Sequence, residues 1–234
     1  MHYETITCPV CSSLNIKKNG INKQGKQRYR CKECGRQFIL RYTYRAYLNS
    51  IRELIVPMCL NGSGIRDTAR VLRISATTVM KVISQEARQL APETLPERIA
   101  DVELDEMWSF VQKKKNQCWL WLAYSPKERQ MLAFSLGKRT DQSLRNLLSK
   151  LSGVQVTRFY TDNWESYQNL IPEIRHWIGK TGTQRIERQN LNFRTHLKRL
   201  QRRTICFSKS KKMLEAVVKL YVHQINSSSI SFVT

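Results

Sequence analysis

The chain has 234 residues, of which 41% are hydrophobic, so it is long enough to bury the core of one large domain or of several small ones. Forty Lys and Arg residues against eighteen Asp and Glu residues give a formal net charge of +22 at pH 7. This excess argues against a neutral enzyme of small-molecule metabolism and favours a polyanionic partner, most commonly nucleic acid. An anionic membrane surface is the alternative partner, but no apolar run approaches the roughly 18 residues that span a bilayer.

The start of the chain contains a pattern of paired cysteines. It shows no secretory leader, which predicts a cytoplasmic protein whose cysteines are thiols or metal ligands. The pairs Cys8/Cys11 and Cys31/Cys34 have the spacing of a zinc ribbon, in which four thiolates close a tetrahedral structural site. The alternating residues between the pairs indicate a β-hairpin, and we assign the ribbon to residues 1–42.

The next segment, residues 43–92, has the pattern of a helix-turn-helix. Residues 44–60 have the apolar spacing of a helix, whose end Pro57 is expected to kink, and two shorter helical stretches follow. Ala69 is small where two helices must pack closely, and Ser75 is placed to cap the second of them. This order predicts a DNA-binding domain, although any small helical hairpin shares the pattern. The residues predicted to contact DNA are Arg66, Thr77, Thr78 and Lys81.

After a proline-containing linker at residues 93–100, strands and helices are mixed. Apolar runs predict strands and helices in the order β-β-β-α-β-α-β-α, beginning with an antiparallel meander. The predicted strands are 101–111, 118–124, 131–136, 154–161 and 175–178, and the predicted helices are 141–151, 164–170 and 183–203. This order predicts a mixed α/β layer fold for residues 101–226, with a tail at residues 227–234.

Three carboxylates are the candidate catalytic residues. Asp105 lies in the first predicted strand, Asp162 ends the fourth, and Glu187 lies in the first turns of the last predicted helix. Glu187 is the only acidic residue between Glu173 and Glu215, a stretch rich in Lys and Arg, where a lone carboxylate weakens the attraction for phosphate. A bound divalent cation explains its presence. If the first and fourth strands are neighbours, the three carboxylates meet around Mg²⁺ ions suited to phosphodiester cleavage.

Each carboxylate also has a simpler explanation. Asp105 has Glu103 and Glu106 beside it, so either neighbour can be mistaken for the functional acid. Asp162 can cap the following helix, and Glu187 can pair with a nearby arginine. Their joint placement is more specific than any one of them.

The predicted helix at 183–203 also carries basic residues. On this helix Arg194 and Lys198 share a stripe with Glu187. We therefore predict that Arg194 and Lys198 bind the DNA backbone beside the metal.

These motifs together resemble those of transposases of the insertion sequence 1 family, along nearly the whole chain. The resemblance rests on the cysteine ribbon, the helix-turn-helix at 64–83, LDEMW at 104–108, YTDNW at 160–164, TQRIERQN at 183–190, RTHLKRL at 194–200 and TICFS at 204–208. It implies an RNase H-like catalytic domain with a DDE triad, matched here by Asp105, Asp162 and Glu187. Arg194 matches the basic residue that such transposases place seven residues after the glutamate.

The resemblance implies a bacterial, nucleoid-associated DNA transposase with structural Zn²⁺ and catalytic Mg²⁺ or Mn²⁺. The N-terminal domains bind the terminal inverted repeats of double-stranded DNA, and the catalytic domain cleaves each end and joins it to target DNA. Because two ends are handled together, a homodimer or higher oligomer is expected. The alternatives are a zinc-ribbon helix-turn-helix regulator without catalysis and a metal-dependent nuclease without strand transfer.

Overall fold

The computed structural model describes residues 5–42 and 44–230. The chain divides into two compact units, Met1–Tyr47 and Leu48–Thr234. Among the described residues, no helix combines the length and the apolar character needed to cross a membrane. The predicted tail overlaps the last helix, which runs to residue 230, and residues 231–234 lie outside the described residues.

The first unit contains a small antiparallel sheet. Its strands are β1 (Ile16–Ile21), β2 (Gln27–Cys31) and β3 (Gln37–Ile39). The predicted hairpin between the cysteine pairs is confirmed, because β1 and β2 pair antiparallel. Apart from the cysteines, Phe38 is a rare buried apolar side chain here, and it stacks on Tyr29 with ring centroids 5.8 Å apart. So small a core cannot stabilise the unit without a metal.

The second unit begins with four helices. They are α1 (Asn49–Glu53), α2 (Ile55–Leu60), α3 (Ile65–Leu72) and α4 (Ala76–Gln89). The helix predicted over residues 44–60 is divided into α1 and α2, and the kink expected from Pro57 lies at Leu54. Pro57 has no N–H to donate to the Glu53 carbonyl, and its ring crowds that carbonyl, so the helix breaks at Leu54.

Helices α3 and α4 form the predicted helix-turn-helix. The Ser75 hydroxyl accepts a 3.0 Å hydrogen bond from the Thr78 N–H, which confirms the predicted cap of α4. Arg73 ends α3 in the left-handed region, with φ 55°, and turns the chain toward α4. Val79 and Ile83 of α4 are fully buried.

A five-stranded sheet forms the centre of the remaining chain, in the order β6-β5-β4-β7-β8. The strands are β4 (Arg98–Met107), β5 (Trp119–Ser125), β6 (Gln130–Gly137), β7 (Gln155–Thr161) and β8 (His176–Ile178). The first three strands form the predicted antiparallel meander, whereas β7 runs parallel to β4 and β8 runs parallel to β7. The mixed α/β fold is therefore confirmed, and β4 and β7 are neighbours as predicted.

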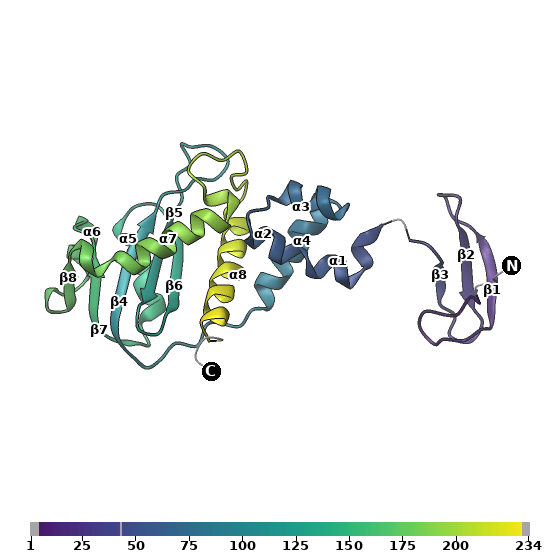
Figure 1. The fold of residues 1–234 in the computed structure, drawn as a ribbon, viewed down its shortest axis with the longest axis horizontal. Coiled ribbons are helices and arrows are strands. Elements are labelled where there is room, and N and C mark those ends of the chain that lie inside the picture. Colours follow the sequence, from purple (N-terminus) through teal and green to yellow (C-terminus); the bar gives the residue numbers. More distant parts are fainter. Residues whose placement is uncertain (1–4, 43, 231–234) are drawn as a thin grey trace. The chain divides into compact units, whose positions relative to one another are not determined.

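Helices cover both faces of this sheet. Helices α5 (Asp141–Leu148) and α6 (Glu165–Leu170) pack on one face around Trp121, and Tyr167 of α6 is fully buried there. Helix α7 (Gln184–His196) crosses the other face, as Figure 1 shows.

The last helix, α8 (Lys211–Ile230), packs against the edge strand β6 and against α2 and α4. The Asn226 amide bonds to both the N–H and the carbonyl of Met131, so it satisfies backbone groups of that edge. Through α8, the helix-turn-helix and the α/β sheet belong to one compact unit.

The end of α7 corrects the sequence prediction. The helix stops at His196 instead of continuing to residue 203, and Lys198–Leu200 forms a separate 3₁₀ turn. Leu197 is extended and fully buried, and Leu200 is also buried. On a continuous helix the spacing from Ile186 and Phe193 would also place both leucines on the buried face, so the apolar spacing alone does not mark where α7 ends.

Candidate active site

The pairing of β4 with β7 places Asp105 and Asp162 level with each other. Glu103 is the partner of Tyr160 in this parallel pair, and the same register extended by two residues matches Asp105 with Asp162. Residues paired in this way point to the same face of a sheet. Asp162 follows the last residue of β7, so both acids lie at the carboxyl ends of their strands.

Glu106 points to the opposite face and has structural partners. Its carboxylate forms a 2.7 Å ion pair with Arg139 and accepts a 2.7 Å hydrogen bond from the Tyr167 hydroxyl. Its side chain is only 2% exposed, and burial raises its pKa. The Arg139 guanidinium also lies over the Trp119 and Trp164 rings, at 5.0 and 4.6 Å from their centroids. Glu106 is thus not the acid that faces α7.

Glu103 shares the face of Asp105, but it binds the beginning of α7. Its carboxylate accepts a 2.6 Å hydrogen bond from the Ile186 N–H and another from the Arg185 N–H. The Thr183 side chain does not cap this helix. Glu103 therefore satisfies the free N–H groups of the first turn, next to Glu187.

Asp105 is held by two donors. Its Oδ1 accepts a 2.8 Å hydrogen bond from the Glu106 N–H, and its Oδ2 accepts a 2.5 Å hydrogen bond from the Asn190 side chain. Burial and the neighbouring charge of Glu106, together with the charges of Asp162 and Glu187, raise its pKa to about 7. The three predicted carboxylates thus share one electrostatic environment.

Asp162 and Glu187 are more exposed than Asp105. Asp162 accepts a 3.2 Å hydrogen bond from the Trp164 N–H, but Trp164 is itself the N-cap of α6 and no side chain caps this helix, so the capping explanation is not confirmed. Glu187 accepts a 3.2 Å hydrogen bond from the Thr183 hydroxyl. Within the described residues, neither Arg188 nor Arg194 forms an ion pair with Glu187, so the structural ion-pair explanation receives no support.

The three carboxylates do not form a tight cluster. Among the described residues, the four cysteines are the group whose ligand atoms all lie within 4.8 Å of one another. Like charges at such a spacing repel unless a cation lies between them. Carboxylate oxygens and the buried, unpaired Asn190 Oδ1 are oxygen ligands of the kind that Mg²⁺ accepts, so the residues present fit this ion.

The two basic residues predicted beside this site differ. Arg194 is half-buried, and it donates to the Leu200 and Trp108 carbonyls at 3.0 and 3.4 Å. It thereby joins the end of β4 to the turn after α7, and burial lowers its pKa. Lys198 lies beyond the end of α7, so the prediction that it shares a helical stripe with Glu187 is wrong.

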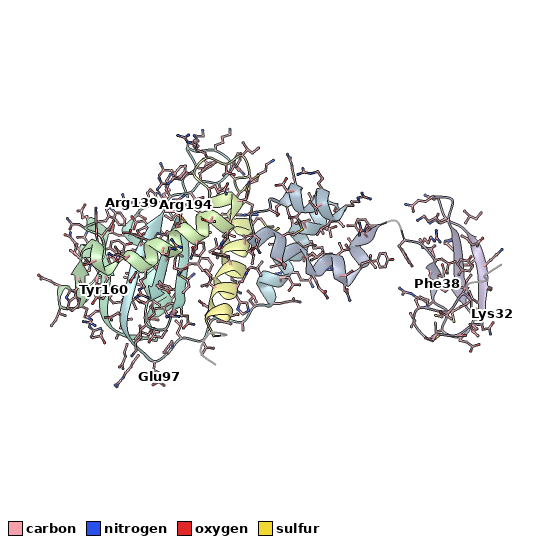
Figure 2. The ribbon with its side chains drawn as sticks, viewed as in Figure 1. Lys32, Phe38, Glu97, Arg139, Tyr160 and Arg194 are labelled. Atoms are coloured by element: carbon pink, nitrogen blue, oxygen red, sulfur yellow. The ribbon has the colours of Figure 1, made fainter. Side chains whose placement is uncertain are left out.

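The position of the site in the fold can be followed in Figure 2. Arg139 and Arg194 lie near one end of the sheet, whereas Glu97, which precedes β4, lies near the opposite end. Arg139 pairs with Glu106, and Arg194 contacts Trp108 just beyond β4. The candidate site therefore lies at the end of the sheet that these arginines mark.

The predicted DNA-contacting residues of the helix-turn-helix are placed as follows. Arg66 on α3 and Thr77 and Lys81 on α4 are exposed. Thr78 is half-buried, and its hydroxyl lies 2.9 Å from that of Ser75, so it contributes to the helix cap. The exposed start of α4 has the position that a recognition helix offers to a DNA groove.

The cysteine cluster has the geometry of a zinc site. The Sγ atoms of Cys8 and Cys34 are 3.5 Å apart, and those of Cys11 and Cys31 are 3.6 Å apart. Four sulfurs at 2.3 Å from a tetrahedral zinc are about 3.8 Å apart, close to these distances. Backbone N–H groups of Cys11 and Val10 lower the pKa of the Cys8 thiol to about 6, whereas hydrogen bonds with the neighbouring cysteines raise the pKa of Cys11 to about 12. The close sulfurs therefore share protons, which a bound cation would displace.

The structure also identifies residues that the motifs did not. The sequence shows Glu103 only as a neighbour of Asp105, and it gives no sign that its carboxylate reaches α7. Asn190 lies three residues after Glu187, a helical spacing that places the two side chains on adjacent turns. This spacing indicates in the sequence that Asn190 lies beside the candidate site. Arg139 and Tyr167 carry no such signal, because their partner Glu106 is distant in sequence.

Comparison with known proteins agrees with this arrangement. Family models match residues 98–227 as "IS1 transposase", residues 42–85 as "InsA C-terminal domain" and residues 1–35 as "InsA N-terminal domain". The matches place a zinc ribbon, a helix-turn-helix and a DDE transposase domain in this order along the chain.

Similar proteins include the insertion element iso-IS1n protein InsB of Shigella dysenteriae, which is 46% identical over 122 residues, or 52% of this chain and 93% of that protein. The insertion element IS1 protein InsB of Shigella flexneri is 42% identical over 125 residues, or 53% of this chain and 95% of that protein. An Escherichia coli IS1 protein InsB is 38% identical over 143 residues, covering 58% of this chain and 86% of that protein. The chain therefore belongs to the IS1 transposase family.

Proposed function

We propose that this protein binds the terminal inverted repeats of an insertion sequence and catalyses metal-dependent cleavage and strand transfer of DNA. The main support is the register of β4 and β7, which sets Asp105 level with Asp162 on the face that α7 crosses with Glu187. The charges of Asp162 and Glu187 both act on Asp105. Without a bound cation, three acids at one end of a sheet repel one another and weaken the attraction of the protein for phosphate.

In this proposal Asp105, Asp162 and Glu187 hold the divalent cation. When bound, it neutralises charge on the scissile phosphate and favours the deprotonated form of the attacking oxygen. Asp105 is the most fixed of the three, because the Glu106 N–H and Asn190 hold one oxygen each. Asp162 lies at the end of β7 and Glu187 lies on α7. The placement of these two carboxylates around the cation therefore depends on how rigidly β7 and α7 are held.

Two successive displacements at phosphorus complete the proposed reaction. Water first releases a 3′-hydroxyl at each end of the element, and this hydroxyl then attacks a target phosphodiester. Since both steps have the same in-line geometry, one set of carboxylates serves both. No Ser or Tyr nucleophile and no covalent protein–DNA intermediate are required.

The other parts of the chain serve recognition in this proposal. The ribbon holds one structural zinc ion through Cys8, Cys11, Cys31 and Cys34. Arg66, Thr77, Thr78 and Lys81 contact the repeat, and Arg194 and Lys198 contact DNA near the site. Because two ends must be joined to one target, the active form is a homodimer or a larger oligomer, and it acts on DNA in the bacterial nucleoid.

The experiment combines the full chain with donor DNA ends, Mg²⁺ and a plasmid target. The wild type is expected to nick the ends and join them to the plasmid. Asp105→Asn, Asp162→Asn and Glu187→Gln are expected to lose both products while still binding the ends. Lys127→Ala, which removes an exposed charge from the turn between β5 and β6, is the control.

Two results contradict the proposal and separate its rivals. Wild-type protein that binds the ends but neither cuts nor joins them is a regulator of the helix-turn-helix class. Protein that cuts without joining is a nuclease. Retained activity in all three carboxylate variants rejects the assigned residues.

A further inference from the structure

One amide beside the carboxylates is only half satisfied. Asn190 lies on α7 three residues after Glu187, and its Nδ2 donates a 2.5 Å hydrogen bond to Asp105. Its Oδ1 is buried and has no hydrogen-bond partner, and it is the only buried side-chain N or O in the described part of the chain of which this is true. The unpaired atom therefore belongs to the same residue that positions the most buried of the three acids.

A buried acceptor without a donor is unfavourable, and native proteins rarely keep one unless a bound group satisfies it. The acids nearby are acceptors as well, so they offer Oδ1 no hydrogen when ionised. Mg²⁺ and Mn²⁺ sites often retain several bound waters, and such waters are strong hydrogen-bond donors. A hydrated cation at the carboxylates therefore supplies the donor that the Asn190 oxygen lacks.

We propose that Asn190 is a fourth residue of the cation site, an inference that rests on the proposed function. Its amide N–H groups hold Asp105 in place, and its amide oxygen accepts a hydrogen bond from a water bound to the cation. Asn190 is in this account a positioning residue for Asp105 and for the hydration shell of the ion. Glu187 and Asn190 on adjacent turns then present a carboxylate and an amide from one helix.

The test measures Mn²⁺ binding to the full, zinc-loaded chain, by the electron paramagnetic resonance signal of free Mn²⁺. The main variant is Asn190→Leu, because leucine has a similar volume, favours helices and removes the unpaired oxygen. Asn190→Ala is the second variant. Asn192→Leu is the matched control, since Asn192 is half-buried on the same helix and its amide contacts Gln189 instead. Asp105→Asn shows whether the measured ion occupies this site.

Both Asn190 variants are expected to weaken Mn²⁺ binding by roughly 10- to 100-fold, the usual effect of removing an outer partner of a metal site. Asn192→Leu is expected to bind as the wild type does. Asn190→Leu removes the unpaired oxygen but also the donor to Asp105, so its thermal unfolding should change only a little, and a cooperative transition near that of the wild type separates the loss of binding from a loss of folding.

The inference is overturned if both Asn190 variants bind Mn²⁺ as tightly as the wild type does. The Asn190 Oδ1 would then be satisfied by a buried water that is not bound to the cation. In that case DNA cleavage that still depends on Asp105, Asp162 and Glu187 leaves the proposed function intact. A wild type that neither binds Mn²⁺ nor cleaves DNA ends overturns both.

Discussion

The carboxylate of Glu103 accepts a 2.6 Å hydrogen bond from the backbone N–H of Ile186, 83 residues away in the sequence. This bond fixes the beginning of α7 to the middle of the sheet, one residue before Glu187. Glu103 and Asp105 therefore share a face of β4 but have separate tasks. One holds the helix, and the other belongs to the proposed cation site.

We expect Glu103→Ala to lower the free energy of unfolding by about 1–3 kcal/mol, because it leaves buried N–H groups of α7 without an acceptor. DNA-end cleavage should fall by roughly 100-fold, since a small displacement of Glu187 misplaces the reacting groups. Urea unfolding and single-turnover cleavage measure the two effects. Glu103→Gln keeps an acceptor oxygen and should recover most of both, and Glu97→Ala, at the opposite end of the sheet, is the control. Equal loss in the Gln and Ala variants contradicts the capping role.

The second prediction concerns the network on the other face. Arg139→Met leaves Glu106 without its cation and should cost about 1–3 kcal/mol of stability, which is below the roughly 3–5 kcal/mol of fully buried pairs because the arginine is 39% exposed. Tyr167→Phe removes only the hydroxyl bond to Glu106 and should cost about 1–2 kcal/mol. The double variant should cost less than the sum, since both partners serve one carboxylate. Strict additivity in thermal unfolding would show that the two contacts are independent.

Metal removal should affect one unit of the chain. Chelation of zinc, or Cys31→Ser, is expected to unfold the first unit, because its core contains few buried apolar residues besides the cysteines. The second unit should keep its thermal transition. Elemental analysis should give one zinc per chain in the wild type. Cys118→Ser, which lies in the second unit, should retain the full zinc content, and a fall in that variant would be inconsistent with the assigned site.

Salt dependence tests the helix-turn-helix surface. Lys81→Ala should weaken binding to DNA about equally for different sequences and reduce the slope of log affinity against log salt by about 1, if the lysine contacts a phosphate. Thr77→Ala should instead alter the preference among sequences. Lys127→Ala removes the same charge from the turn between β5 and β6, outside the helix-turn-helix, and should leave the slope unchanged. A slope change of the same size in Lys127→Ala indicates a general charge effect.

Local patterns were sufficient to predict much of this molecule. The cysteine spacing, the Ser75 cap and the apolar runs of β4, β5, β6 and β7 follow rules that involve few residues at short range. The neighbouring placement of β4 and β7, and with it that of Asp105 and Asp162, was inferred from the order of the elements. The structure agrees.

Long-range contacts explain what the sequence could not predict. Helix α7 ends at His196 although Leu197 and Leu200 continue its apolar spacing, so no short pattern marks that end. The break at Leu54, in contrast, follows from Pro57, which is a local signal. Helix α8 was missed, although Leu214, Val217, Val218 and Tyr221 have helical spacing and are buried. The different roles of Glu103, Asp105 and Glu106 depend on partners from α6, α7 and Arg139, which no short pattern contains.

The most direct test of the central claim is anomalous diffraction at the manganese edge from crystals of the chain with a DNA end and Mn²⁺. The account predicts anomalous density within about 2.3 Å of a carboxylate oxygen of Asp105 and of at least one oxygen of Asp162 or Glu187. Density bound instead by Glu103 or Glu106, or no ion near these three acids while the DNA end is in place, would contradict it.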